Sequence, residues 1–121
     1  MRANDQPPVE MFGLEHCDTC KKARKWLATA GIAVRFSDYR QQPIAGEQLK
    51  AWGTELGWEA LVNRSGTTWR NLLPQRQHPG TAAEYVLLVR ENPSLLRRPI
   101  LLVDGKVTLG FSHGLYEKLF A

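Results

Sequence analysis

The sequence predicts an α/β fold in which two strand-containing halves flank an inserted helical segment. Three observations support this: a β-α-β succession near the start, a helical middle, and a β-hairpin followed by a helix at the end. A chain of 121 residues can bury one hydrophobic core but is short for two separate domains. We therefore assign residues 1–121 to a single domain.

The first half reads as strand, helix and strand. Residues Val9–Leu14 form a short apolar run that fits a strand, and a helical pattern begins at Asp18. The apolar positions of this helix are spaced i, i+3, i+4 and i+7: Ala23, Trp26, Leu27 and Ala30. Gly31 marks its end, and Ile32–Tyr39 alternates apolar and polar residues as a half-buried strand does. The connection suits a right-handed parallel crossover.

The middle of the chain is predicted to be helical. Leu49, Trp52 and Leu56 repeat at helical spacing before Gly57, and a short helical turn follows in "WEALVNRSG". Thr81 and Glu84 match a capping box, in which each side chain satisfies the other residue's free backbone N–H. The helix that they open runs to about residue 92, where a proline follows.

The end of the chain is predicted to be a hairpin and a helix. "PILLVDGKVTLGF" contains two apolar runs separated by Asp104-Gly105, a strong signal for a tight hairpin turn, and Leu115–Phe120 reads as a closing helix. The complete order matches a thioredoxin-like fold with a four-stranded mixed sheet. Its halves are expected at about 8–42 and 94–121, and the all-helical insertion at about 43–93.

Composition and charge exclude several classes of protein. The chain is 43% hydrophobic and 23% charged, with a formal charge of +4, which is typical of a globular protein. No apolar window is long enough for a membrane span, and the polar first eight residues do not resemble a signal peptide. We expect a cytoplasmic protein without a membrane partner. No basic stripe with interleaved aromatic residues indicates direct nucleic-acid binding.

The two cysteines of the chain, Cys17 and Cys20, form a CxxC motif where the first strand meets the first helix. Backbone N–H groups at a helix start lack partners, and the helix dipole adds positive potential there. Basic residues at 21, 22, 24 and 25 add charge that favours the thiolate, whereas Asp18 opposes it. These features predict a modestly lowered pKa for the Cys17 thiol.

Cys20 lies one helical turn after Cys17, within disulfide range. A redox-active pair is favoured over a merely small buried residue, because CxxC near a βαβ unit is typical of redox proteins. A zinc site is disfavoured, since the three histidines, His16, His78 and His113, show no paired spacing. Trp26 and Trp52 are expected in the core, and Trp58 and Trp69 are left open.

The tripeptide Arg97-Arg98-Pro99 precedes the third strand. A proline at this place can hold a cis peptide bond, and the alternative is a trans proline beside two solvated arginines. Residue types alone favour the second interpretation.

Four segments stand out when taken together: "CDTCKKARKWL", "LVNRSGTTWR", "PSLLRRPILLVDGK" and "LGFSHGLYEKLF". In this combination and order they resemble the arsenate reductase (ArsC) family, in its Spx/MgsR/YffB-like branch. The resemblance implies a thioredoxin-like fold with an all-helical insertion, a nucleophilic cysteine at Cys17 and a cis proline at Pro99. It also implies that Arg64 and Arg98 hold an oxyanion or a carboxylate of glutathione, and we place Lys21 in the same anion-binding shell.

The resemblance also implies candidate functions. We expect a thiol–disulfide oxidoreductase that binds no cofactor, uses glutathione as a co-substrate or acts on a protein disulfide, and uses Cys17 with Cys20. The alternative is an Spx-type redox-sensing regulator that binds RNA polymerase. Arsenate reduction is a minor alternative, because Glu15 and His16 replace the usual asparagine and proline, and "GFSHG" lacks a third arginine.

Overall fold

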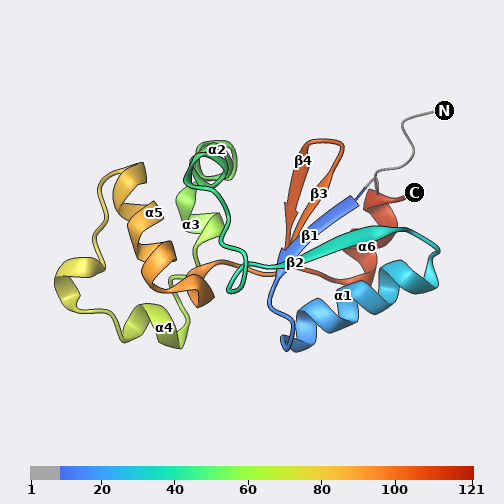
Figure 1. The fold of residues 1–121 in the computed structure, drawn as a ribbon, viewed down its shortest axis with the longest axis horizontal. Helices are drawn as coiled ribbons and strands as arrows, with labels where there is room; N and C mark the ends of the chain where they lie inside the picture. The colour runs from blue at the N-terminus through green and yellow to red at the C-terminus, as the bar shows by residue number, and fades with distance from the viewer. Residues whose placement is uncertain (1–8) are drawn as a thin grey trace. The chain divides into compact units, whose positions relative to one another are not determined.

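The chain divides between a four-stranded sheet with two helices and a separate group of helices (Figure 1). The structure is a computed structural model that describes residues 9–121. One compact unit runs to Gln42 and resumes at Arg98–Ala121, and the other is Pro43–Arg97. We call them the thioredoxin-like unit and the helical unit.

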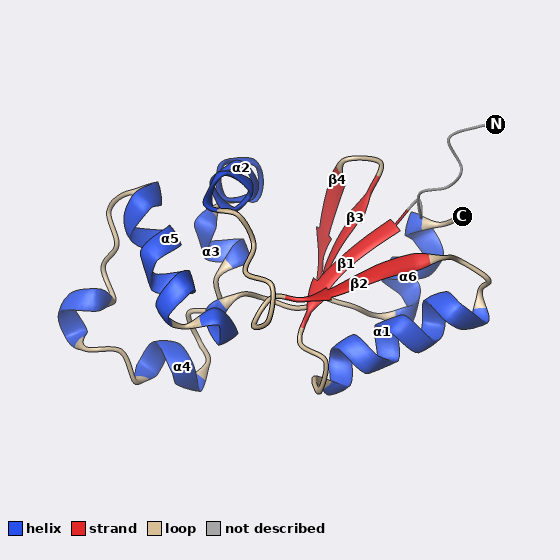
Figure 2. Cartoon of the chain, viewed as in Figure 1, coloured by secondary structure: helices blue, strands red, loops and turns tan. Residues whose placement is uncertain are grey.

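The sheet has the mixed topology that the sequence predicts. Strand β1 (Val9–Gly13) lies between β2 (Val34–Asp38), to which it is parallel, and β3 (Ile100–Val103), to which it is antiparallel. Strand β4 (Lys106–Leu109) pairs with β3 at the edge, which gives the order β2-β1-β3-β4 (Figure 2). The predicted thioredoxin-like fold is confirmed.

Helices α1 (Asp18–Thr29) and α6 (His113–Leu119) pack against one face of this sheet. Their shared core consists of buried side chains from β1, β3 and the two helices: Val9, Met11, Ala23, Leu27, Leu101 and Tyr116. Trp26 meets Tyr116 edge to face, with ring centroids 5.5 Å apart, so its expected place in the core is confirmed. Helix α6 begins two positions before the predicted Leu115, because the Ser112 hydroxyl accepts a hydrogen bond from the Leu115 N–H at 3.0 Å and caps the helix.

The hairpin turn between β3 and β4 is the one predicted. Asp104 has φ 50° and Gly105 has φ 81°, so both central residues occupy the left-handed region. This combination is the type I′ geometry, whose twist matches that of the flanking strands.

The helical unit contains four α-helices and two single turns of 3-10 helix. They are α2 (Gly46–Leu56), α3 (Trp58–Leu61), α4 (Thr67–Arg70), η1 (Pro74–Arg76), α5 (Ala82–Glu91) and η2 (Pro93–Leu95). Trp52 is 2% exposed, as expected, and Trp69 is 7% exposed. Trp58 stacks on Tyr85 with ring centroids 4.7 Å apart, so the tryptophans of this unit are packing residues.

The predicted capping box of α5 is half confirmed. Thr81 is the N-cap, and its hydroxyl accepts from the Glu84 N–H at 3.2 Å. The returning bond differs: the Glu84 carboxylate accepts from the Gly80 N–H at 3.0 Å and from the Thr81 hydroxyl. The carboxylate therefore reaches one residue further back than the capping-box pattern predicts.

No helix within residues 9–121 has the length and apolar character needed to cross a membrane. The prediction that the first eight residues are not a signal peptide concerns positions outside the described residues.

Candidate active site

The C-terminal ends of β1 and β2 and the N-terminal end of β3 lie at the same end of the sheet and bring the candidate residues together. Gly13 ends β1 opposite Asp38, which ends the parallel strand β2. Ile100 begins the antiparallel strand β3 opposite Phe12. The segments that follow β1, follow β2 and precede β3 therefore leave the sheet side by side. They carry Cys17, Tyr39 and Arg98 respectively.

Cys17 is the N-cap residue of α1, with extended backbone angles (φ −85°, ψ 125°). Its N–H donates to the Leu14 carbonyl at 3.1 Å, and its carbonyl accepts from the Lys21 N–H at 2.9 Å. This geometry places the half-buried sulfur at the open end of the helix, near the N–H groups of Thr19 and Cys20, which help to lower the pKa of its thiol. The first turn of α1 thus presents backbone N–H groups without intrahelical partners close to the sulfur.

The environment of Cys17 favours its thiolate. Burial raises the pKa of the Cys17 thiol, but hydrogen bonds from the Cys20 N–H, the Cys20 thiol, the Arg98 guanidinium and the Thr19 N–H together hold it below its usual value. The predicted direction is confirmed. The cation in contact is Arg98, whereas the Lys21 side chain is exposed and Arg24 lies over the Phe36 ring at 4.2 Å.

Cys20 has the opposite environment. It is fully buried, and this burial raises the pKa of its thiol to about 11, with a further contribution from the hydrogen bond to Cys17. A β-carbon on Gly13 would lie only 2.5 Å from the Cys20 Sγ, so the last residue of β1 has to be glycine for Cys20 to fit. Sequence reasoning missed this requirement, although a glycine that ends a strand before CxxC is a signal for close approach.

Arg98 is held from both its backbone and its side chain. The Arg98–Pro99 peptide bond is cis, as the family resemblance implies, and the Pro99 carbonyl accepts from the Gly110 N–H at 2.8 Å. The half-buried guanidinium donates to the Cys17 sulfur and to the Tyr39 hydroxyl. Arg97 is different, since its Nε donates to the Ala60 carbonyl at 2.8 Å within the helical unit.

Sequence reasoning assigned no role to Asp38, the last residue of β2, or to Tyr39 and Arg40 in the turn that follows. The Asp38 carboxylate accepts from the Glu15 N–H at 2.9 Å and the Arg40 N–H at 2.8 Å, and the Glu15 bond is the main cause of its lowered pKa. Tyr39 donates its N–H to the Gly13 carbonyl at 3.0 Å. The turn therefore fixes the loop that leads to Cys17. The predicted parallel direction of the first two strands is the sequence signal for this position, because parallel strands end at the same end of a sheet.

An open pocket of about 270 Å³ gives access to the cysteine. It is lined by residues of the loop before α1, the turn after β2 and the start of β3: Leu14, Glu15, His16, Cys17, Asp38, Arg40 and Arg98. The half-buried thiol of Cys17 therefore shares this pocket with two arginines, Arg40 and Arg98, and with two acidic residues, Glu15 and Asp38. A thiol- or disulfide-bearing ligand can reach Cys17 through this pocket, with Arg98 beside the sulfur.

Arg64, predicted to bind an anion, belongs to the helical unit. Its guanidinium pairs with Glu59 at 3.3 Å and lies over the Trp69 ring, 5.0 Å from the centroid. Cys17, Cys20 and Arg98 lie in the other unit. The binding roles assigned to Arg64 and Lys21 stay predictions.

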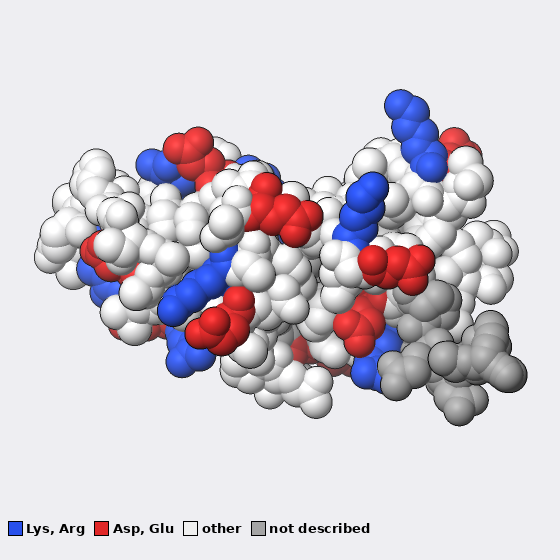
Figure 3. All heavy atoms as spheres, turned by 90° about the horizontal axis from the view of Figure 1, so that it is seen from above, with Lys and Arg blue, Asp and Glu red and all other residues white. Residues whose placement is uncertain are grey.

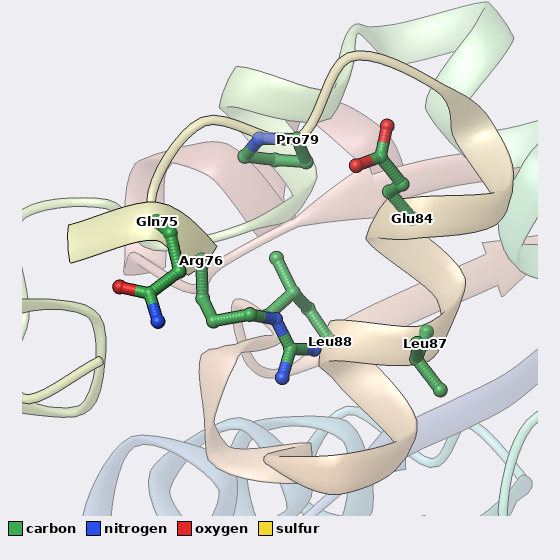
Figure 4. Close-up of a pocket in the computed structure, with 6 residues that line it drawn as sticks. All are labelled: Gln75, Arg76, Pro79, Glu84, Leu87 and Leu88. Atoms are coloured by element: carbon green, nitrogen blue, oxygen red, sulfur yellow. The ribbon is translucent and has the colours of Figure 1, made fainter. Parts of the chain in front are cut away.

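The helical unit has a small pocket of its own, of about 100 Å³. It lies between α5 and the segment before it, and Figure 4 shows its lining: Gln75, Arg76, Pro79, Glu84, Leu87 and Leu88. Arg76 pairs with Glu91, and the Glu84 carboxylate is engaged in the helix cap. Because its charged groups serve local structure, we do not assign chemistry to this pocket.

Within residues 9–121 no group of three or more His, Cys, Asp or Glu side chains is placed to hold a metal ion. On the face shown in Figure 3, basic and acidic side chains are interspersed rather than segregated.

Comparison with known proteins decides the family. The ArsC family model matches residues 12–119, nearly the whole described chain. This chain belongs to the ArsC family. An uncharacterised family relative from Haemophilus influenzae is 40% identical over 113 residues, which cover 93% of this chain and 99% of the relative.

Two further similarities lie within the Spx/YffB-like branch of the family. The solved structure of the YffB protein superposes with a TM-score of 0.86 at 35% identity, covering 93% of this chain and 99% of that one. The global transcriptional regulator Spx of Enterococcus faecalis is 32% identical over 108 residues, covering 87% of this chain and 80% of the regulator.

Proposed function

We propose that this ArsC family protein is a glutathione-linked thiol–disulfide oxidoreductase with Cys17 as its nucleophile. The observation that carries the proposal is the contrast between two thiols one helical turn apart. Cys17 faces an open pocket and has a lowered pKa, whereas Cys20 is sealed and has a pKa of about 11. The Cys17 thiol is therefore available as the attacking thiolate, whereas the Cys20 thiol stays protonated and does not attack first.

The first step is attack by the Cys17 thiolate on one sulfur of a disulfide. A new bond forms between this sulfur and Cys17, the original S–S bond breaks, and the departing thiolate takes a proton from solvent. Arg98 and the N–H groups of Thr19 and Cys20 stabilise the thiolate before attack. Because they favour the ionised form, they also make Cys17 a better leaving group when the mixed disulfide is resolved.

Two thiols are candidates for the resolving step. Cys20 can give up its proton and attack the Cys17 sulfur, which releases the bound thiol and leaves a Cys17–Cys20 disulfide. Alternatively, a glutathione thiolate attacks the sulfur of the bound group and frees Cys17. The raised pKa of Cys20 slows the first route near neutral pH, so we propose that glutathione serves the second.

Arg98, Arg64 and Lys21 are proposed to bind the negative charge of the substrate. Arg98 lines the pocket beside Cys17 and already contacts the sulfur. A planar guanidinium donates two parallel hydrogen bonds to a carboxylate, which suits the carboxylates of glutathione.

Reduction of a glutathione–peptide mixed disulfide, with glutathione as the reductant, tests the proposal. We expect wild-type protein and Cys20→Ser to turn over and Cys17→Ser to fall to the uncatalysed rate. Cys20→Ser is the matched control because it also replaces one thiol by a hydroxyl in the same helical turn. Equal rates for wild type and Cys17→Ser would refute the enzyme function.

A redox-switched regulator is the second candidate, favoured by the similarity to the Spx regulator and by the CxxC pair. Oxidation of the pair would move the first turn of α1, where Cys17 is the cap, and so change the surface around it. RNA polymerase is the partner proposed. Capture of its subunits by the oxidised or the reduced protein supports this function, and equal background in both states removes it.

Arsenate reduction is a minor candidate supported by family membership. It predicts arsenate-dependent consumption of reducing equivalents that is lost in Arg98→Ala. Consumption that stays at background with arsenate present removes this candidate.

A further inference from the structure

The side chain of Tyr39 is buried. Its hydroxyl contacts Arg98, a residue of the site, but Tyr39 does not line the pocket. It is 2% exposed, and burial raises the pKa of its hydroxyl to about 12. Its oxygen accepts a hydrogen bond from Arg98, and that guanidinium also donates to the Cys17 sulfur. The planar guanidinium of Arg98 therefore links the neutral, buried hydroxyl of Tyr39 to the sulfur of Cys17.

The position of Tyr39 is set by main-chain contacts on both sides. Its N–H donates to the Gly13 carbonyl at 3.0 Å, which extends the pairing of β1 with β2. The preceding residue, Asp38, holds the Glu15 and Arg40 N–H groups. The buried side chain of Tyr39, whose backbone is held in this way, has few alternative positions. A free arginine side chain has many rotamers and loses more conformational entropy when it is held in one of them.

We propose that Tyr39 is a positioning residue that holds the Arg98 guanidinium against the Cys17 sulfur. The inference rests on the proposed role of Cys17 as the nucleophile and adds the group through which the arginine is aimed. Tyr39 contacts Arg98 and is not among the residues that line the pocket, so we infer that it acts through the arginine and not on the substrate.

Arginine suits this arrangement and lysine does not. The fork of the guanidinium presents several N–H donors in one plane, so it can bind the tyrosine oxygen and the sulfur at once. Without the tyrosine oxygen, one edge of the fork loses its acceptor and the side chain gains rotamers that point into the open pocket. The fraction of time that it spends on the sulfur then falls, and the thiolate loses a stabilising donor.

The test compares the pH midpoint of Cys17 alkylation, assigned by mass spectrometry, in four full-length variants. They are Tyr39→Phe, Arg98→Gln, the double variant and Tyr116→Phe. Tyr116→Phe is the matched control, because this tyrosine is equally buried and its hydroxyl has no hydrogen-bond partner among the described residues.

Loss of the hydroxyl in Tyr39→Phe is expected to lower the acid dissociation constant of Cys17 roughly three- to tenfold, the size of one hydrogen-bond contribution. Arg98→Gln lowers it at least as much. The double variant matches Arg98→Gln alone, because Tyr39 acts through the arginine. Tyr116→Phe matches wild type. A midpoint for Tyr39→Phe equal to that of Tyr116→Phe overturns the inference, as does a further shift when Tyr39→Phe is added to Arg98→Gln.

A second variant serves if Tyr39→Phe does not fold. Arg98→Lys keeps the charge but replaces the rigid planar fork by one nitrogen on a flexible stem, so the midpoint is expected to rise, and a midpoint equal to wild type contradicts the inference. These measurements need no turnover. An absence of disulfide reduction by wild type would remove the proposed function, and the alkylation series would still decide the role of Tyr39.

Discussion

The two units of this protein use the same residue type in different ways. In the thioredoxin-like unit Arg98 is half-buried and donates to a tyrosine hydroxyl and a cysteine sulfur. In the helical unit Arg64 and Arg76 pair with carboxylates at the surface, and the partner of Arg64, Glu59, has a side chain that is 82% exposed. Water screens such exposed pairs, whereas a guanidinium fixed beside a half-buried sulfur changes the chemistry of that sulfur. Placement rather than residue type gives an arginine its effect.

The largest loss of stability is expected when a glycine that lies in close contact with a side chain is replaced by alanine, and each unit contains one such glycine. A β-carbon on Gly53 would overlap the Trp58 ring, and one on Gly13 would lie 2.5 Å from the Cys20 Sγ. Gly53→Ala and Gly13→Ala are each expected to lower the free energy of unfolding by about 1–3 kcal/mol, the usual cost of overpacking. Urea denaturation measures both.

Gly114→Ala is the control for this pair, since no atom lies within 4 Å of its added carbon. It lies in helix α6, where alanine is favoured over glycine, so we expect no loss of stability. Only Gly13→Ala should also change the reactivity of the cysteines. A cost in Gly114→Ala equal to the other two would contradict the packing explanation.

The second effect separates the two arginines. Arg98→Gln is expected to slow the reaction of Cys17 with a mixed disulfide at neutral pH about tenfold, which corresponds to about 1.4 kcal/mol. Arg64→Gln is expected to leave the pH midpoint of Cys17 alkylation where it is, and a rise in KM alone would support the binding role proposed for Arg64. Equal shifts of the midpoint in both variants would show that Arg64 also stabilises the thiolate.

A third, smaller effect compares the helix caps of the two units. Thr81 caps α5 and Ser112 caps α6, each by accepting one backbone N–H. Thr81→Ala and Ser112→Ala are each expected to cost about 1 kcal/mol in unfolding free energy. Hydrogen exchange at the first turn of each helix tests whether the loss is local. Uniform loss of protection across both units in either variant would contradict this.

The smallest effect concerns exposed ion pairs. Arg35 pairs with Glu10 at 3.5 Å in the thioredoxin-like unit, and Arg64 pairs with Glu59 at 3.3 Å in the helical unit. Double-mutant cycles are expected to give less than about 1 kcal/mol for either pair. A larger coupling in one of them would mark that pair as structurally important.

The sequence predicted most of the fold because its elements carry local signals. Periodicity located helix α1, and Asp104-Gly105 located the hairpin. Helix α4 and the turn η1 were not predicted, since three or four residues are too few for an apolar period. The start of α6 was placed too late because the cap formed by Ser112 was overlooked.

Part of the site was also predictable, because some of its residues carry local sequence signals. The CxxC motif at a helix start indicated Cys17, and family resemblance indicated Arg98 and Pro99. Gly13 was missed although its partner, Cys20, lies in the first turn of the next helix. Tyr39 was not found, because its importance depends on contacts with residues distant in the sequence. Such contacts follow from strand polarity, which brings the ends of β1 and β2 to the start of β3.

The most direct measurement is the pH profile of alkylation for both cysteines in one wild-type sample. It is made at reagent levels that label a small fraction of the protein, with mass spectrometry to assign the sites. We expect Cys17 to react with a midpoint below that of an ordinary thiol, about 8.5, and Cys20 to react only as the pH nears about 11. Coincident profiles, or a Cys17 midpoint at or above the ordinary value, would contradict a thiolate held ready by Arg98.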